Sequence, residues 1–326
     1  MQYVLLSSGC EMPIVGLGTW KTEPQEIEEA VQLALENGYR HIDTAYNYNT
    51  EEAVGTVVNK WIKQDKLKRE DVFITTKLPV FGNRPGDVEK YIKLSLQRLN
   101  LSYIDLYLIH MPFSFHSNDQ MNAPLINEDG SPRLDVESDI IETWKEMEKQ
   151  VEAGLTKTIG LSNFNIDQVK RIHSNAKIKP AVLQVELHLY LQQKKLREAC
   201  KKLDVAVTAY APLGSPGANA HFMAKYNYTL EDFPDILGLP VVNELAEKYK
   251  KTPGQILLKH LIQQDVSVIP KSKNPERIQA NIELFDFELT NDDLERLNEI
   301  DKEEKGRIFN FLFFKGVEKH PEYPFK

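Results

Sequence analysis

The sequence predicts a closed (β/α)8 barrel, also called a TIM barrel, in a chain of 326 residues. From Val15 onward, short runs of β-branched and aromatic residues alternate eight times with longer segments of helical spacing. Several of these runs stop at an ionisable side chain, as expected where parallel strands end at the active face of a barrel. The main rival, a doubly wound sheet, would open with a GxGxxG turn, and the segment GLGTW does not fit that motif.

The first part of the chain predicts a hairpin and then three strand–helix units. Residues 3–6 and 11–15 flank the turn SSG and are expected to cap one end of the barrel. A helix is expected from Pro24 to the stop signal at Asn37-Gly38, and Asp87 is expected to cap a later helix. The other expected elements are a strand end at 15–18, strand 39–43, helix 51–63, strand 72–77 and helix 87–99.

The second part of the chain continues this alternation and adds two long loops. The expected elements are strand 104–109, helix 138–152, strand 156–161, helix 165–174, strand 181–186, helix 192–202, strand 205–210, helices 240–250 and 253–263, strand 266–270, and helices 275–284 and 291–300. Residues 112–135 and 211–235, after the fourth and seventh strands, lose periodicity, and loops of this length often serve as lids or pocket walls. A C-terminal tail rich in phenylalanine follows. No segment resembles a linker, so residues 1–326 are expected to form a single domain.

Charge and composition argue against several classes of function. The net charge is −8, with 40 basic and 48 acidic residues and no basic block, which argues against nucleic acid or an anionic membrane as partner. No apolar run approaches the ~18–20 residues of a membrane span, and the N-terminus lacks the basic segment of a signal peptide. Cys10 and Cys200 are too few for a disulfide framework, and no Cys/His cluster has zinc spacing. We therefore expect a cytoplasmic, metal-free monomer.

Asp43, Tyr48, Lys77 and His110 form the first candidate site. Each alone also fits an ordinary role, as a cap, a half-buried aromatic, a rim lysine or a core histidine. Three of them end successive strands, however, and Tyr48 follows five residues after Asp43, so coincidence is a poor explanation. The Lys77 ammonium is expected to favour the phenolate of Tyr48, and Asp43 is expected to pair with Lys77. With a neutral His110 to orient the substrate, such a site can donate a proton to a carbonyl oxygen.

Ser162, Asn163, Gln184 and Tyr210 lie at the ends of later strands and form the second candidate site. The flat ring of Tyr210 and the amides of Asn163 and Gln184 suit an aromatic carboxamide such as nicotinamide. Ordinary strand-end caps and turns are the alternative. The sequence alone leaves both interpretations open.

The segment PKSKNPERIQAN, residues 270–281, predicts an anion site at the last strand and the following helix N-terminus. Arg277 is suited to a phosphomonoester, and barrels place phosphate sites near strands seven and eight. Gly214-Ser215 could add backbone N–H groups for a pyrophosphate. The alternative is a solvated basic turn.

Many aromatic residues lie in loops and in the tail. Because an exposed run such as FNFLFF would be unfavourable in water, we expect this group to wall an apolar pocket and to pack the tail on the barrel. The group comprises Trp20, Phe81, Phe113, Phe115, Phe309, Phe311, Phe313 and Phe314.

The segments GLGTW, GYRHIDTAYNYNTEEAVG, ITTKLP, IDLYLIHMP, GLSNFN, LQVELH, TAYAPLGSP, IPKSKNPERIQAN and HPEYPF occur in this order. With them the chain resembles the aldo-keto reductase superfamily over essentially its full length, nearest its aldose reductase-like and insect-type members. The resemblance implies a barrel that binds NADPH or NADP+ and reduces a small-molecule carbonyl compound. It also implies a catalytic tetrad of Asp43, Tyr48, Lys77 and His110.

By the same resemblance, Tyr210 stacks on the nicotinamide, and the segment 271–281 takes the adenosine 2′-phosphate and adenine end of the cofactor. The implied cofactor-binding residues are Gly18, Thr19, Trp20, Asp43, Ser162, Asn163, Gln184, Tyr210, Pro212, Leu213, Gly214, Ser215, Pro270, Lys271, Ser272, Lys273, Asn274, Arg277 and Asn281. The implied substrate pocket comprises Trp20, Tyr48, Phe81, His110, Met111, Phe113 and Phe309.

This sequence departs from aldose reductase at the pocket. Met111 replaces a tryptophan, and Phe309 stands where several relatives carry a reactive cysteine. The substrate therefore stays open among lipid or aromatic aldehydes, sugars and ketosteroids such as a 3-dehydroecdysteroid. Two other functions also stay open: an NADPH-binding sensor or structural barrel without catalysis, and a Schiff-base aldolase that uses Lys77.

Overall fold

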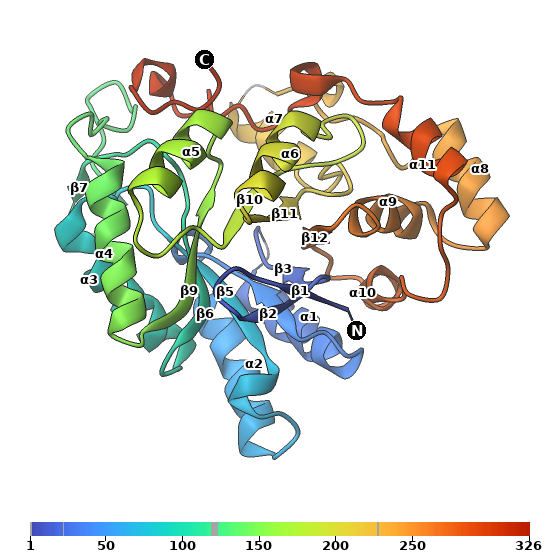
Figure 1. Ribbon diagram of the computed structural model, residues 1–326, viewed down its shortest axis with the longest axis horizontal. Helices are drawn as coiled ribbons and strands as arrows, with labels where there is room; N and C mark the ends of the chain where they lie inside the picture. The colour runs from blue at the N-terminus through green and yellow to red at the C-terminus, as the bar shows by residue number, and fades with distance from the viewer. Residues whose placement is uncertain (1, 22, 119–122, 227) are drawn as a thin grey trace.

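The computed structural model describes residues 2–21, 23–118, 123–226 and 228–326 (Figure 1). Its centre is an eight-stranded parallel sheet. The strands are, in their order in the sheet, β3 (Leu17–Gly18), β4 (His41–Asp43), β5 (Phe73–Leu78), β6 (Ile104–Ile109), β9 (Thr156–Ser162), β10 (Val182–Glu186), β11 (Ala206–Tyr210) and β12 (Val266–Val268).

The two edges of this sheet meet and close it into a barrel. Val15, just before β3, forms a parallel bridge with Val268 of β12. The N–H of Gly16 donates to the Val268 carbonyl oxygen at 2.9 Å, and the N–H of Val268 donates to the Ile14 carbonyl oxygen at 2.8 Å. The predicted (β/α)8 fold is therefore confirmed.

Helices surround the barrel and connect its strands (Figure 1). They are α1 (Pro24–Glu36), α2 (Glu51–Lys63), α3 (Pro85–Leu99), α4 (Ile140–Glu152), α5 (Ile166–Asn175), α6 (Lys194–Lys202), α7 (Asn219–Tyr226), α8 (Pro240–Tyr249), α9 (Pro253–Ile262), α10 (Pro275–Ile282) and α11 (Asn291–Asn298). Side chains that reach back to the backbone begin several of them, as Asn165 does for α5 and Thr252 for α9. Among the described residues, no helix combines the length and the apolar character needed to cross a membrane.

The predicted N-terminal hairpin is confirmed and covers one end of the barrel. Strands β1 (Tyr3–Leu5) and β2 (Glu11–Pro13) pair antiparallel. Leu6 and Met12 of this hairpin pack in one apolar cluster with residues in or just before strands β5, β6 and β10, and two of them, Phe73 and Val182, are the first residues of their strands. These barrel residues are Phe73, Leu106, Leu108, Ala181 and Val182. Burial of these side chains stabilises the barrel at the end opposite to the carboxyl ends of its strands.

Close packing explains two glycines at the first barrel strand, Gly16 just before β3 and Gly18 within it. A Cβ added at Gly16 would lie 2.7 Å from Nδ1 of His41, and one added at Gly18 would lie 2.8 Å from the Ile269 carbonyl oxygen. Both distances are too short for real Cβ contacts, so only glycine lets this strand pass between its neighbours.

Three expectations about local structure are wrong. Asp87 does not cap α3, because Pro85 takes the first helical position and the extended residue before it, Arg84, is the N-cap. The loop after β6 is not wholly irregular, since it contains the antiparallel strands β7 (Ser117–Asn118) and β8 (Ala123–Pro124). The stretch after β11 likewise contains α7, whose Phe222 is buried.

Candidate active site

The carboxyl ends of β4, β5 and β6 bring together the four residues of the first candidate site. Asp43 is the last residue of β4, Lys77 is the penultimate residue of β5, and His110 directly follows β6. Tyr48 ends the 3₁₀ helix η1 (Tyr46–Tyr48), which follows β4. The rings of Tyr48 and His110 lie 5.6 Å apart between centroids, and Lys77 Nζ lies 4.9 Å from the Tyr48 ring centroid.

Lys77 and Asp43 form a buried ion pair beneath this group. Their side chains are 1% and 2% exposed, and Lys77 Nζ donates to Asp43 Oδ1 at 2.6 Å. The ammonium also donates to the Thr44 carbonyl oxygen at 2.9 Å. Burial lowers the pKa of Lys77, and the Asp43 carboxylate acts against this shift. Each charge therefore depends on the other, because a buried charge without a partner is strongly unfavourable.

Tyr48 and His110 differ from this pair because both side chains keep part of their surface exposed. The net pKa shift of Tyr48 is opposite to the lowering that an adjacent ammonium alone would give. Burial, followed by the nearby Asp43 and Tyr210, raises the pKa of Tyr48 well above its usual value. Burial and the Lys77 ammonium lower the pKa of His110 well below its usual value. Both accessible groups are thus neutral near neutral pH, a phenol and an imidazole.

The second candidate site is connected to the first through Asp43. Gln184 Nε2 donates to Asp43 Oδ2 at 2.7 Å. Asn163 Nδ2 donates to the His110 carbonyl oxygen at 2.9 Å and to Ser162 Oγ at 3.1 Å, and the Tyr210 hydroxyl donates to Asn163 Oδ1 at 2.8 Å. The structure therefore joins the amide that follows β9, the amide of β10 and the ring that ends β11 to Asp43 and His110 of the first site.

Aromatic side chains continue this surface toward the tail. The Trp20 ring lies 5.8 Å from the Phe309 ring and 6.0 Å from the Phe222 ring, and the Phe309 ring lies 6.0 Å from the Tyr210 ring. Phe309 comes from the C-terminal tail and Phe222 from α7. Trp20 and Phe309, two of the predicted pocket residues, thus contact each other. Met111 also reaches the site, since its sulfur accepts from Asn163 Nδ2 at 3.3 Å.

Phe81 and Phe113 lie elsewhere than the other predicted pocket residues. Phe81 is buried against Tyr46 and Tyr91, with ring centroids 6.2 and 5.5 Å away. Phe113 is fully buried, and its ring contacts include Phe311 of the tail at 5.8 Å. In the described part of the chain, no ring contact joins either residue to Trp20, Tyr48 or Phe309.

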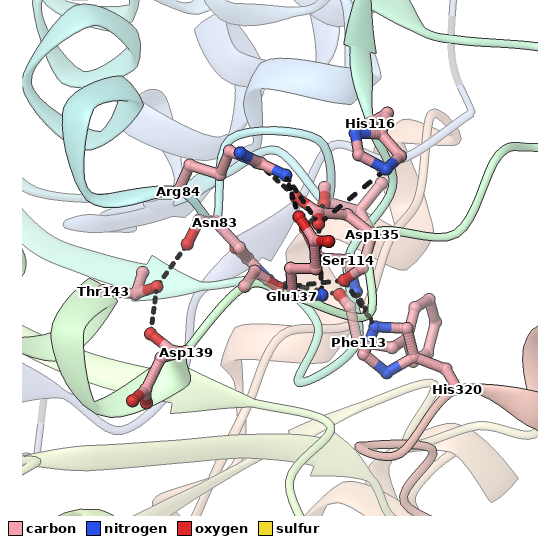
Figure 2. A network of polar contacts seen from close by, with 12 residues as sticks. Asn83, Arg84, Phe113, Ser114, His116, Asp135, Glu137, Asp139, Thr143 and His320 are labelled. Atoms are coloured by element: carbon pink, nitrogen blue, oxygen red, sulfur yellow. Dashed lines mark hydrogen bonds and ion pairs between the residues drawn. The ribbon is translucent and has the colours of Figure 1, made fainter.

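Figure 2 shows the polar network that holds the loop after β6 against the tail. Arg84 Nε donates to Asp135 Oδ2 at 2.6 Å, and His320 Nε2 lies 2.9 Å from the Asp135 carbonyl oxygen. The N–H of Glu322 donates to His320 Nδ1 at 3.0 Å, and the N–H of Ser114 donates to His320 Nε2 at 3.3 Å. This network explains why Phe113, whose ring lies 6.3 Å from that of His320, is enclosed between the two segments.

The predicted anion site lies after β12 and at the start of α10. Asn274 caps α10 by accepting the N–H of Arg277 at 2.9 Å, and Ser272 Oγ accepts the N–H of Asn274 at 3.1 Å. Lys273 pairs with Glu26 of α1 at 2.6 Å. Burial, followed by the Lys273 ammonium, lowers the pKa of Lys271. Arg277 is exposed and makes no ion pair with any residue that the structure describes.

The remaining predicted cofactor residues occupy the same end of the barrel. The Thr19 hydroxyl donates to the Asp43 carbonyl oxygen at 2.9 Å, and Pro270 accepts the N–H of Gly18 at 3.2 Å. A Cβ added at Gly254 would lie 3.9 Å from both Leu213 Cδ1 and Asn281 Oδ1, so both side chains lie near the start of α9. Pro212, Gly214 and Ser215 follow β11. The N–H of Gly214 already donates to the Ala211 carbonyl oxygen at 2.9 Å, so it is not free for a phosphate.

Lys21 is a residue of this site that the sequence reasoning missed. Its Nζ is buried without a hydrogen-bond partner among the described residues, and it lies 4.7 Å from the Trp20 ring and 4.4 Å from the Phe222 ring. Burial and the Lys225 ammonium lower its pKa to about 8. In the sequence, a lysine beside threonine and glutamate is typical of a solvated loop. No pattern signalled its burial.

Among the described residues, no group of three or more His, Cys, Asp or Glu side chains could hold a metal ion. The comparisons with known proteins agree with the fold and with this set of side chains. A model of the aldo/keto reductase family matches residues 14–302. The chain belongs to the aldo/keto reductase family.

Individual members of the family are similar over the full length of the chain. This aldo/keto reductase is 44% identical over 329 residues to aldo-keto reductase family 1 member A1 of Gallus gallus, which covers 99% of this chain and 97% of the relative. It is 42% identical over 328 residues to the Homo sapiens protein of the same name, with coverage of 99% and 97%. The solved structure of the aldose reductase from Schistosoma japonicum matches it with a TM-score of 0.89 at 40% identity, covering 100% of this chain and 99% of that chain.

These similarities make this aldo/keto reductase an oxidoreductase that acts on carbonyl compounds. Members of the family generally use a nicotinamide cofactor and act on small-molecule carbonyl substrates.

Proposed function

We propose that this aldo/keto reductase reduces aldehydes or ketones to alcohols with NADPH, and that Tyr48 is the general acid. The observation that carries this proposal is the layered arrangement of the four ionisable residues. A fully buried ion pair of Lys77 and Asp43 lies beneath a partly exposed tyrosine and histidine. A carbonyl oxygen that enters from the exposed side meets the phenol and the imidazole first.

Each of the four residues has a distinct task in the proposed reaction. The raised pKa of Tyr48 keeps its proton in place until a carbonyl oxygen accepts it. As negative charge develops on the Tyr48 oxygen, the Lys77 ammonium stabilises it, and Asp43 keeps Lys77 charged. Neutral His110 donates a hydrogen bond to the same carbonyl oxygen and holds it toward Tyr48.

The side chains around this site fit NADPH. Lys21 Nζ is a buried cation without a partner among the described residues, so an anionic group beside it would supply the missing contact. Lys271 and Arg277 add cations near the helix N-terminus of α10, where a 2′-phosphate would be stabilised. Ser162, Asn163, Gln184 and Tyr210 would hold the nicotinamide, and the cofactor would supply the hydride that reduces the carbonyl carbon.

The aromatic surface favours apolar substrates over sugars. Trp20, Phe222 and Phe309 lie in mutual contact beside Tyr210, and of these four rings Trp20 and Tyr210 keep part of their surface exposed. Such a surface gains free energy by covering an aromatic or aliphatic group, whereas a sugar would lose hydrogen bonds to water there. We therefore propose aromatic aldehydes, lipid aldehydes or ketosteroids as the substrate class.

The Tyr48→Phe variant tests the proposal. We expect its kcat to fall by about 10²–10⁴-fold, because the general acid is removed without a change in ring volume. The measurement is NADPH oxidation with a nitrobenzaldehyde, a medium-chain aldehyde, an aldose and a 3-ketosteroid. NADPH binding, followed by quenching of tryptophan fluorescence, should stay near that of the unaltered protein. Full turnover in this variant would exclude Tyr48 as the acid, and NADPH binding without turnover of any carbonyl would favour a non-catalytic barrel.

A further inference from the structure

Glu186 is a buried carboxylate to which the proposed reaction gives no task. It is the last residue of β10, lies opposite Tyr210 of β11 in the sheet, and is 0% exposed. Its two carboxylate oxygens face the C-terminal tail, which is red in Figure 1, and not the Lys77–Asp43 pair. A carboxylate that is fully removed from water persists only where donors replace its hydration.

Three donors meet this carboxylate. The N–H of Ile308 donates to Oε1 at 2.7 Å, and the N–H of Phe309 donates to Oε2 at 2.9 Å. The Nε2 of His188, itself fully buried, lies 3.0 Å from Oε1. Because an ionised carboxylate only accepts hydrogen bonds, it matches a site built entirely of donors. A glutamine would instead turn an NH₂ group toward one of these donors.

Phe309, one of the two tail residues held in this way, also contacts the proposed reaction site. Its ring lies 6.0 Å from Tyr210 and 5.8 Å from Trp20, and its side chain is 5% exposed. A second contact brings the tail close to the loop after β10, since a Cβ added at Gly306 would lie 2.0 Å from the Tyr190 carbonyl oxygen. The tail has no regular structure around Phe309, so its path depends on such contacts.

We propose that Glu186 is a positioning residue that sets Phe309 against Tyr210 and Trp20 and thereby determines the binding of large apolar substrates. The proposal rests on the proposed reductase function. Glu186 acts through the tail backbone and does not touch the reacting atoms. A small aldehyde, held by Tyr48 and His110 alone, does not depend on Phe309. A bulky aromatic or steroid ketone needs Phe309 as part of its binding surface.

The Glu186→Gln variant tests this assignment against a matched control. Glu148 of α4 is also buried and also accepts two consecutive backbone N–H groups, those of Lys177 and Ile178, at 2.7 and 3.0 Å. Its partners lie in the loop that leads into the amino end of β10, whereas Glu186 is at the carboxyl end of that strand. Glu148→Gln therefore removes the same kind of interaction without touching Phe309.

We expect Glu186→Gln to raise KM for a 3-ketosteroid by about tenfold, the loss of one charged hydrogen bond, with kcat little changed. KM for propanal should change by less than about twofold, because propanal does not reach the tail. Glu148→Gln should leave both KM values unchanged. If KM rises equally for the two substrates in Glu186→Gln, Glu186 is only structural and the proposal is overturned. The proposal is also overturned if Glu148→Gln raises KM for the 3-ketosteroid alone.

A double-mutant cycle with Phe309→Ala identifies the route of the effect. If Glu186 acts through Phe309, the second substitution should add little to the KM increase of the first. Fully additive increases would overturn the proposal. Should Glu186→Gln not fold, Glu186→Asp, which keeps the charge but withdraws it by one methylene, takes its place in the same measurements.

Amide hydrogen exchange separates failure of this proposal from failure of the reductase assignment. We expect the segment 307–310 to exchange faster in Glu186→Gln and not in Glu148→Gln, with no substrate present. Unchanged exchange would overturn the positioning role even in an active enzyme. If the unaltered protein reduces no carbonyl compound, the reductase assignment fails, while the exchange result still decides whether Glu186 fixes Phe309.

Discussion

At the scale of single residues, the buried pair of Lys77 and Asp43 determines what the site can do. The pair is nearly inaccessible to solvent, and each partner makes a further hydrogen bond. Lys77 donates to the Thr44 carbonyl oxygen, and Asp43 accepts from the Gln184 amide. Removal of one charge from such a pair leaves the other buried and unpaired, which is far less favourable than removal of both. The same two charges therefore affect both stability and catalysis, and variants can separate these effects.

We expect Lys77→Met to lower the free energy of unfolding by about 3–5 kcal/mol and to abolish carbonyl reduction. The double variant Asp43→Asn/Lys77→Met should regain much of the stability but none of the activity. Urea unfolding and NADPH oxidation measure the two effects. Lys93→Met is the matched control, because Lys93 pairs with Glu89 at 2.5 Å on an exposed helix surface, and it should lower stability by less than about 1 kcal/mol. A stable Lys77→Met enzyme would contradict the assigned role of the pair.

Arg277 permits a test of the cofactor assignment at the other end of the site. Because its guanidinium is exposed and makes no ion pair within the described residues, Arg277→Ala should leave the fold intact. We expect NADPH binding to weaken by about 10–100-fold, since one charged hydrogen-bond partner of the 2′-phosphate is lost. Fluorescence titration with NADPH and NADH provides the measurement, and NADH binding should not change. Arg296→Ala is the control, because Arg296 is an exposed arginine paired with Glu244, and it should change the binding of neither cofactor. Equal weakening for both cofactors would remove the phosphate assignment.

At the scale of elements, the packing of neighbouring helices depends on the absence of a side chain at Gly55. This residue lies in α2, and a Cβ there would be 2.3 Å from the Leu99 carbonyl oxygen at the end of α3. The two helices thus approach each other through backbone. Helix propensity alone would favour alanine at this position, so tertiary packing overrides the local preference.

The Gly55→Ala variant should lower the free energy of unfolding by about 1–3 kcal/mol, because α2 and α3 must separate to admit the methyl group. Gly86→Ala provides the matched control in α3. A Cβ at Gly86 would have no atom within 4 Å, so this variant should raise stability by about 0.4–1 kcal/mol. Chemical denaturation of both variants measures the difference. Stabilisation by both substitutions would show that the helices separate without cost.

At the scale of the whole molecule, the two ends of the barrel have different tasks. The hairpin β1–β2 covers the amino ends of the strands with an apolar cluster, whereas the ionisable residues lie at the carboxyl ends. This separation is the general arrangement of (β/α)8 enzymes, in which one end stabilises and the other carries chemistry.

The Met12→Ala variant tests this separation. Met12 is fully buried in the hairpin cluster, so its truncation should lower the free energy of unfolding by about 2–5 kcal/mol. The kcat/KM of the folded enzyme should stay within about twofold, because the cavity forms at the end opposite to Tyr48. Thermal or urea unfolding and NADPH oxidation below the unfolding transition give the two results. A large loss of kcat/KM would show that the two ends are coupled.

The sequence predicted the barrel and much of the candidate site for one physical reason. Runs of β-branched and aromatic residues end in ionisable or polar side chains, and in a parallel barrel the carboxyl ends of all strands meet at one face. Asp43, Lys77 and His110 could therefore be assigned to one site from local patterns. The N-cap of α3 could not be predicted in this way, because Pro85 and Asp87 are both acceptable helix starts. The extended conformation of Arg84 decided between them.

The tertiary structure alone decided the features that depend on residues distant in the sequence. Glu186 meets the N–H groups of Ile308 and Phe309, 122 and 123 positions away, and no local pattern marks such donors. Lys21 Nζ is buried against the ring of Phe222 of α7, a residue far along the chain. The raised pKa of Tyr48 likewise follows from its enclosure by the assembled site. By itself the sequence determined the fold and the identity of the chemical groups, since both follow from local periodicity. Their exposure, charge state and partners depend on long-range packing, and only the folded chain determines them.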